Sequence, residues 1–206
     1  MKQDILEQLV EDWLQAKGYF TRTNFPFKPS KTHSDYHSNK DGVASDIDVI
    51  GFHPGKVGAD RVQVIGCKAW QDGFEIEKMR KALVTNPDQI FGNKEAWKHF
   101  RELVKPKWSD AFVEAVKKAT GSTDFTYVTA ITVSHDLDNK DKWENEPKFK
   151  EAMRNNPIRV ITLREMLEEV FQKLGTSVES SQFSRTLQLI KAAGLTVTLH
   201  TQKPKK

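Results

Sequence analysis

Apolar residues recur every three or four positions in the first part of the chain, which is the spacing of a helix with one buried face. The residues of this pattern between positions 4 and 17 are Ile5, Leu6, Leu9, Val10, Trp13 and Leu14. Gly18 comes next, and glycine favours the left-handed conformation that follows the last turn of many helices. The sequence therefore predicts a first helix that ends at about residue 17.

Stretches rich in aromatic and β-branched residues predict the strands. Residues 19–25 form one such stretch, which closes before Pro26, and residues 45–52 alternate polar and apolar positions. The turn-rich segment HPGKVGAD leads into residues 61–69, so we expect 45–52 and 61–69 to pair as a hairpin. The apolar run 125–133 is typical of a central strand that is covered on both faces.

The remaining segments predict helices around this sheet. Helices are expected at 74–84, at 93–104 and 109–120 on either side of Pro106, at 148–155 and at 163–174, with a strand at 158–162. Residues 28–43 contain many turn formers and almost no apolar side chains, which indicates a long exposed loop. The order of elements favours an α/β fold with a mixed sheet and helices packed against it.

The domain organisation follows from the same reading. We expect residues 1–174 to form one α/β domain with its core at about 3–134. Residues 175–206 are expected to add a linker, a basic amphipathic helix at 182–193, a last strand at 195–200 and a basic tail. This C-terminal extension is a candidate for a DNA-binding or dimerisation appendage, and a simple covering helix is the alternative.

Composition narrows the classes of function. No apolar run approaches the roughly 20 residues that a bilayer span requires, and the N-terminus lacks the cleavage site of a signal peptide, so a cytoplasmic protein without a membrane partner is expected. Cys67 is the single cysteine, which excludes an intramolecular disulfide and a cysteine-rich zinc site. The net charge of +4 is compatible with a polyanionic partner.

Three charged residues lie on the predicted hairpin. Asp46 and Asp48 are two positions apart on one strand, which places them on the same face about 7 Å apart. Lys68 shares a face with Gly66 on the neighbouring strand. Such groups are costly to gather unless they pair, bind a metal or meet an anionic substrate. A structural ion pair between Lys68 and an aspartate is the simpler alternative.

The order of these residues resembles that of a known nuclease superfamily. A helix with an acid, a strand, Asp48 in SDIDVIG, a turn and Lys68 in VIGCKAW is similar to the PD-(D/E)xK superfamily, above all to its Mrr-type restriction endonucleases and Holliday-junction resolvases. The resemblance covers residues 3–84, with 125–133 as the expected fourth core strand. It implies a restriction-endonuclease-like fold, with an αβββαβ core and a helical C-terminal extension.

The resemblance also assigns site residues. The family's helix acid falls on Glu7 in EQLVEDWLQAKGY, with Glu11 one turn later as the alternate, and its strand acid and lysine fall on Asp48 and Lys68. One position departs from the family, because Gly66 stands where an acid normally precedes the lysine by two residues. Either another group replaces that acid, or metal binding is weak, or catalysis has been lost. The local candidates for replacement are Gln71, Glu75 and Glu77.

The chemistry implied by the resemblance is metal-assisted hydrolysis. Asp48, Glu7 and the backbone carbonyl of Cys67 would hold Mg²⁺ or Mn²⁺, with Asp46 as a helper. Lys68 would orient the attacking water and neutralise charge that develops on the phosphate. The Cys67 thiol faces the other way by strand alternation and is interpreted as a core residue.

DNA is the expected partner, with a homodimer as an option. Three basic residues of the helix after the site are candidate phosphate contacts, and they are Lys78, Arg80 and Lys81. The first hypothesis is therefore a metal-dependent endonuclease that cleaves DNA in defence or repair. The second is a nuclease-like protein without catalysis, which binds nucleic acid or a protein partner.

Overall fold

A single mixed sheet organises the chain in the computed structural model, which describes residues 4–70, 72–175 and 181–195. The five strands lie in the order β1-β2-β3-β6-β7. Their bounds are β1 Phe20–Phe27, β2 Ser45–Phe52, β3 Val62–Lys68, β6 Thr126–Ile131 and β7 Ile158–Thr162. The first three strands are antiparallel, whereas β3, β6 and β7 run parallel.

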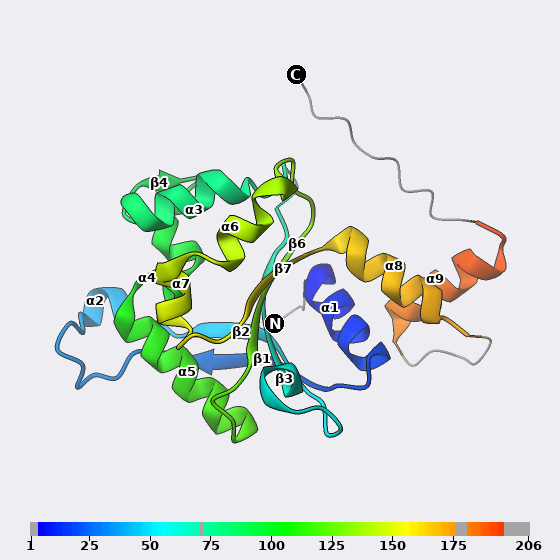
Figure 1. Cartoon of the computed structure of the whole chain (residues 1–206), viewed down its shortest axis with the longest axis horizontal. Coiled ribbons are helices and arrows are strands. Elements are labelled where there is room, and N and C mark those ends of the chain that lie inside the picture. The colour runs from blue at the N-terminus through cyan, green and yellow to red at the C-terminus, as the bar shows by residue number, and fades with distance from the viewer. Residues whose placement is uncertain (1–3, 71, 176–180, 196–206) are drawn as a thin grey trace.

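Helices cover both faces of this sheet (Figure 1). One face carries α1 Ile5–Ala16, α8 Leu163–Lys173 and α9 Gln182–Ala192. The other carries α3 Ile76–Thr85, α4 Arg101–Val104, α5 Pro106–Thr120, α6 Lys140–Glu144 and α7 Pro147–Ala152. The shorter elements are α2 Ser38–Asp41, the hairpin β4 Ile90–Phe91 with β5 Lys94–Glu95, and 3-10 turns at Gly58–Arg61, Ala96–His99 and Leu137–Asn139. The expected α/β class, with a mixed sheet flanked by helices, is confirmed.

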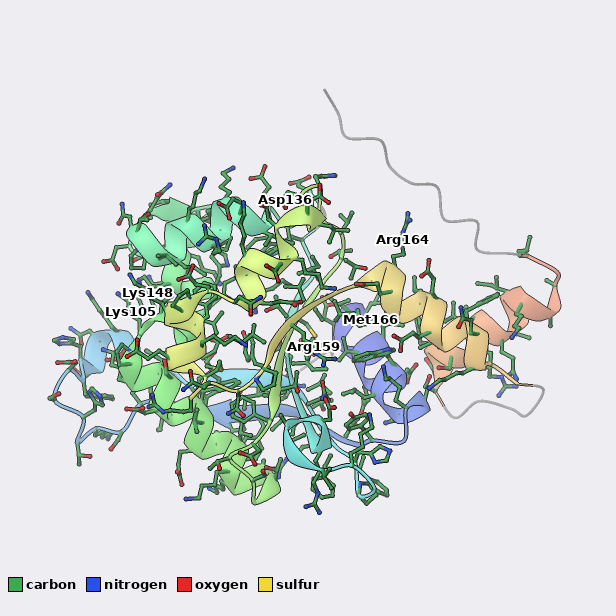
Figure 2. All side chains as sticks on the ribbon, in the orientation of Figure 1. Lys105, Asp136, Lys148, Arg159, Arg164 and Met166 are labelled. Atoms are coloured by element: carbon green, nitrogen blue, oxygen red, sulfur yellow. The ribbon has the colours of Figure 1, made fainter. Side chains whose placement is uncertain are left out.

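Each face of the sheet has its own hydrophobic core. The larger core joins the sheet to α3–α7 and contains Trp108 and Trp143, both fully buried. The smaller core joins the sheet to α1, α8 and α9, and Met166 reaches into it from α8 (Figure 2). Because β6 lies between two strands and under both helical layers, all six of its residues are buried, as the apolar run predicted.

Local signals explain how the helices next to the sheet begin and end. Asp4 caps α1 by accepting a hydrogen bond from the Leu6 amide at 2.7 Å, and Gly18 follows with φ +85°. Thr162 and Glu165 form a capping box at the start of α8, each side chain accepting from the other's backbone amide. These caps fix where the chain leaves the sheet and returns to it.

Several predicted elements differ from those observed. The strand predicted to close near Phe25 continues as β1 to Phe27, because β1 is an edge strand on which Pro26 needs no outward hydrogen bond. The single helix predicted at 93–104 is wrong. That segment holds β5, a 3-10 turn and α4, because Phe100, with φ −144° and ψ 58°, interrupts the helical backbone. The loop predicted at 28–43 contains the short helix α2.

The C-terminal helix packs on the α/β domain. Leu187 of α9 is buried in the smaller core, and Ser184 donates a hydrogen bond to Asp12 of α1 at 3.1 Å. A covering helix is therefore the arrangement observed for 182–192. The strand predicted at 195–200 lies, after Leu195, outside the described residues. Among the described helices, none combines the length and apolar character needed to cross a membrane.

Candidate active site

The candidate site lies where β2 separates from β3. The two strands pair only through Val49–Phe52 and Val62–Ile65, while β3 continues beside β6 to Lys68. Beyond the last pair, Oδ2 of Asp48 accepts a hydrogen bond from the backbone amide of Cys67 at 2.5 Å. A side-chain carboxylate thus takes the place of a strand carbonyl at the point where the sheet opens.

Asp48 also marks a change of face along β2. Ile47 belongs to the larger core and Val49 to the smaller, although simple alternation would put both on one face. Side chains therefore do not alternate regularly across Asp48, and the prediction that Asp46 and Asp48 share a face cannot rest on alternation. Both aspartates nevertheless line the same cavity, which has a volume of about 430 Å³.

Glu7 of α1 adds a second carboxylate close to Asp48. Burial raises the pKa of Glu7, and the charge of Asp48 raises it further. Burial also raises the pKa of Asp48, against the opposing effects of the Lys68 charge and the Cys67 amide. The structure thus brings Asp48 within electrostatic reach of both Glu7 and Lys68. Glu11 instead accepts a hydrogen bond from Thr21 of β1 at 2.9 Å.

Lys68 has no carboxylate partner in the described part of the chain. No described Asp or Glu oxygen lies within 4.0 Å of its Nζ, which lies 5.0 Å from the ring centroid of Phe100. The structural ion pair considered above is therefore not observed there. An ammonium group beside a cavity, near Asp48 but not bonded to it, can meet an anionic ligand.

Cys67 contributes its backbone to the site and its thiol to the interior. The side chain packs against the smaller core, and burial raises the pKa of the thiol well above its ordinary value. A buried, protonated thiol is a poor nucleophile. This placement agrees with the interpretation of the thiol as a core group.

A glutamate from α4 faces the position where the usual acid is missing. A Cβ atom at Gly66 would lie 3.5 Å from Oη of Tyr127 and 3.7 Å from Nζ of Lys68. That Tyr127 hydroxyl donates a hydrogen bond to Oε1 of Glu102 at 2.6 Å, and Glu102 is only 8% exposed. Burial, and then the charge of Glu102, raises the pKa of Tyr127, which keeps the phenol protonated as the donor.

Sequence reasoning missed Glu102. It lies within the segment 93–104, for which the sequence predicts one long helix and nothing in the spacing points towards β3. In the fold, α4 lies close enough to β6 for Glu102 to accept a hydrogen bond from Tyr127. Gly66, Glu102 and Lys68 line the same cavity. Glu102 is therefore the described carboxylate best placed to replace the missing acid.

The predicted replacement acids Glu75 and Glu77 lie elsewhere. Glu75 pairs with Lys78 at 2.6 Å, and Glu77 pairs with Arg80 at 2.8 Å and Lys81 at 3.3 Å. Neither glutamate lines the cavity of Asp48. Gln71, the third candidate, lies outside the described residues.

The predicted phosphate contacts of α3 are engaged by the same acids. Arg80 also pairs with Glu146 at 2.5 Å, so its guanidinium joins α3 to α6–α7. Lys78 and Lys81 border a separate cavity with Glu75 and Glu77. The structure does not bring Lys78, Arg80 and Lys81 together with Asp48.

A group of basic residues that sequence reasoning missed lines the candidate site. Lys94 of β5, Lys98 and His99 of the following turn, and Arg101 of α4 border the cavity of Asp48 and Lys68. Partial burial beside the cavity lowers the pKa of Lys94, and the charges of Lys68 and Arg101 lower it further. Positive charge therefore collects in the lining of the cavity that holds the two aspartates.

The donor set of the candidate site suits a hydrated divalent cation. Within the described residues, no three His, Cys, Asp or Glu side chains gather as a metal site. Mg²⁺, however, binds through one or two carboxylates and keeps several waters. Burial and the charge of Asp48 raise the pKa of Glu7, burial raises the pKa of Asp48, and the Cys67 carbonyl lies on the neighbouring strand β3. These donors fit Mg²⁺ or Mn²⁺ better than zinc.

Comparison with protein-family models, with curated proteins and with solved structures found no match to this chain.

Proposed function

We propose that this protein is a metal-dependent endonuclease that hydrolyses phosphodiester bonds of DNA, in defence against foreign DNA or in repair. The observation that carries the proposal is that Asp48 and Lys68 line one cavity with a basic wall, at the opening between β2 and β3. Glu7 lies within electrostatic reach of Asp48, which supports its assignment by the nuclease resemblance. The observed order of α1, three antiparallel strands, helix and parallel strand also agrees with the restriction-endonuclease-like core that the resemblance implies.

Each residue of the candidate site has a separate role in the proposed hydrolysis. When bound by Asp48, Glu7 and the Cys67 carbonyl, Mg²⁺ or Mn²⁺ would polarise the phosphate and acidify a water molecule. Lys68 brings a positive charge to the side of Asp48, where it orients the water and stabilises the charge that develops on the phosphate. The amide of Cys67 holds the Asp48 carboxylate in place through their hydrogen bond.

Glu102 supplies the acid that Gly66 lacks in this proposal. Its carboxylate accepts from Tyr127, whose hydroxyl lies beside the Cβ position of residue 66. Burial on α4 holds the side chain in this orientation. Its role is to hold a water or a proton in the cavity that Lys68 also lines.

A second function is favoured by one observation. Gly66 removes an acid that the resembling nucleases carry, and the site then retains a basic wall that binds nucleic acid without cleaving it. A nuclease-like binding protein is therefore the alternative.

Cleavage assays separate the two functions. The protein is incubated with plasmid, linear and branched DNA in Mg²⁺ or Mn²⁺, beside the variants Lys68→Gln and Asp48→Asn. The control Lys118→Gln makes the same charge change as Lys68→Gln, on the exposed last turn of α5. We expect cleavage that falls at least about 100-fold in both site variants and stays unchanged in the control. Cleavage that persists in Lys68→Gln would refute the site, and binding without cleavage would favour the alternative.

A further inference from the structure

Arg101 stands at the junction of two neighbouring cavities. It lines the cavity of Asp48 and Lys68, and it also lines a second cavity of about 670 Å³ between α2 and α4. Lys98 is likewise shared by the two. The two cavities therefore lie next to each other, and these two basic residues border both.

The guanidinium of Arg101 is fixed in position but has no bound acid. It lies 4.8 Å from the ring centroid of Trp108 and 5.8 Å from that of Trp97, two buried side chains that hold its plane. Its Nε is buried without a hydrogen-bond partner in the described part of the chain. Glu102 and Asp41 act on Arg101 only through their charges, because neither lies within ion-pair distance. A buried, oriented and unsatisfied donor of this kind suits an anionic ligand.

Three lysines lie around Arg101 in the linings of the two cavities. Lys94 makes no ion pair with a described residue, and its side chain is exposed beside the cavity. Lys98 pairs with Glu95 at 2.6 Å on the shared wall. Lys105, which is labelled in Figure 2 and follows α4, lines the second cavity and pairs with Asp88 at 3.3 Å. The positive groups without an acid partner in the described part of the chain, Lys68, Lys94 and Arg101, therefore gather at the cavity of Asp48.

We propose that Arg101, with Lys94 and Lys98, binds a backbone phosphate of the nucleic acid next to the phosphate held at Asp48 and Lys68. This subsite rests on the proposed function for its position in the reaction but not for its ligand, because a phosphate can bind without being cleaved. It assigns the segment 94–101, which lies outside the nuclease resemblance, to substrate binding.

The test measures binding in the absence of a divalent cation, so that cleavage does not enter the result. Dissociation constants of the full chain for a single-stranded oligonucleotide and for its duplex are measured over a range of salt concentrations. The variants are Arg101→Met, which keeps a long apolar stem on the tryptophans, and Lys94→Gln, an exposed position where folding is safe. Lys118→Gln is the matched control.

We expect each variant to weaken binding about five- to tenfold and to reduce the slope of log Kd against log salt by about 0.7 for the single strand or 0.9 for the duplex. The control should match the wild type. The probe whose binding changes more shows whether the subsite at Arg101 prefers single-stranded or duplex nucleic acid. Unchanged slopes in both variants, or wild-type binding that does not depend on salt, would overturn the subsite. If the variants lose binding as expected but the wild type cleaves no DNA, the subsite stands and the proposed nuclease function fails.

Discussion

Gly66 leaves room for a side chain beside the candidate catalytic groups. A Cβ there would meet Tyr127 and Lys68 only at ordinary van der Waals distances, so Gly66→Glu should fold. Because Glu102 already places a carboxylate near this point, we expect the variant to cleave DNA no faster than the wild type in Mg²⁺. Plasmid nicking rates measure the difference. A rise of tenfold or more would show that the site lacks an acid and that Glu102 does not replace it.

Glu102→Gln also tests whether Glu102 replaces the acid absent at residue 66, because it removes the charge of Glu102. Glutamine can still accept the Tyr127 hydrogen bond, so the fold and the melting temperature should change little. We expect single-turnover cleavage to fall about 100-fold, because the buried negative charge is lost. The exposed Glu114→Gln on α5 is the control. Equal loss in both variants, or no loss in Glu102→Gln, would remove Glu102 from the site.

Glu77 gives a test of stability against pH. Its bidentate hydrogen bonds from Arg80, together with Lys81, lower its pKa from 4.5 to about 2. Because the folded-state pKa is the lower one, the stabilisation is complete above about pH 5 and is lost as the pH falls from about 4.5 towards 2. We expect Glu77→Gln to cost about 1–2 kcal/mol at pH 7 and almost nothing at pH 2.

Urea denaturation of the two proteins at several pH values measures this difference. Glu75→Gln, in which a half-exposed pair with Lys78 is removed, serves as the comparison and should have a smaller effect. If Glu77→Gln lost the same free energy of unfolding at pH 2 as at pH 7, the lowered pKa of Glu77 would not be the cause of the stabilisation.

The segment between β1 and β2 is anchored by one buried carboxylate. Asp41 at the end of α2 accepts hydrogen bonds from Lys107 at 2.6 Å, from Trp108 at 3.2 Å and from the His37 amide at 2.8 Å. Asp41→Asn leaves the Lys107 charge without its partner, so we expect a loss of about 3 kcal/mol in the free energy of unfolding. The exposed Asp35→Asn in the same segment should be neutral. Equal unfolding free energies for Asp41→Asn and the wild type would show that α2 does not depend on this anchor.

The elements differ in how far the sequence predicts them. Strands 45–52 and 158–162 have the predicted bounds, because alternation and flanking turn residues are local signals. The segment 93–104 misled the prediction, because its apolar residues fit a helix, while Gly92 and Asn93 between β4 and β5 turn the chain into a hairpin. That segment carries the basic wall, so the error in the element hid part of the candidate site.

The residues of the candidate site also differ in how far the sequence predicts them. Glu7, Asp48 and Lys68 lie within the stretch covered by the nuclease resemblance, and a family pattern can assign them from spacing alone. Glu102 reaches the cavity with a hydrogen bond from Tyr127 of β6, 25 positions away in sequence, and Arg101 reaches it where its guanidinium lies over Trp108 of the next helix. No periodicity in one sequence encodes such contacts. Residues that approach through tertiary packing therefore have to come from the structure.

The relation of α9 to the rest of the chain can be tested with one pair of substitutions. Leu187 is 8% exposed in the smaller core, whereas Leu189 on the same helix is 64% exposed. If α9 is an integral covering helix, Leu187→Ala should lower the free energy of unfolding by about 2 kcal/mol and Leu189→Ala should not. Thermal melting of the full chain measures both. A single transition unaffected by Leu187→Ala would indicate an appendage that unfolds independently.

The hydrogen bond between the Cys67 amide and Asp48 makes the open end of the sheet observable by spectroscopy. Its acceptor is a side chain that ligands can also engage, unlike the fixed carbonyls that bind the other amides of β3. The nitrogen and proton resonances of Cys67 should therefore move whenever a ligand draws the Asp48 carboxylate away. A single labelled cysteine in the chain gives one such signal, so a titration can be followed without any cleavage assay.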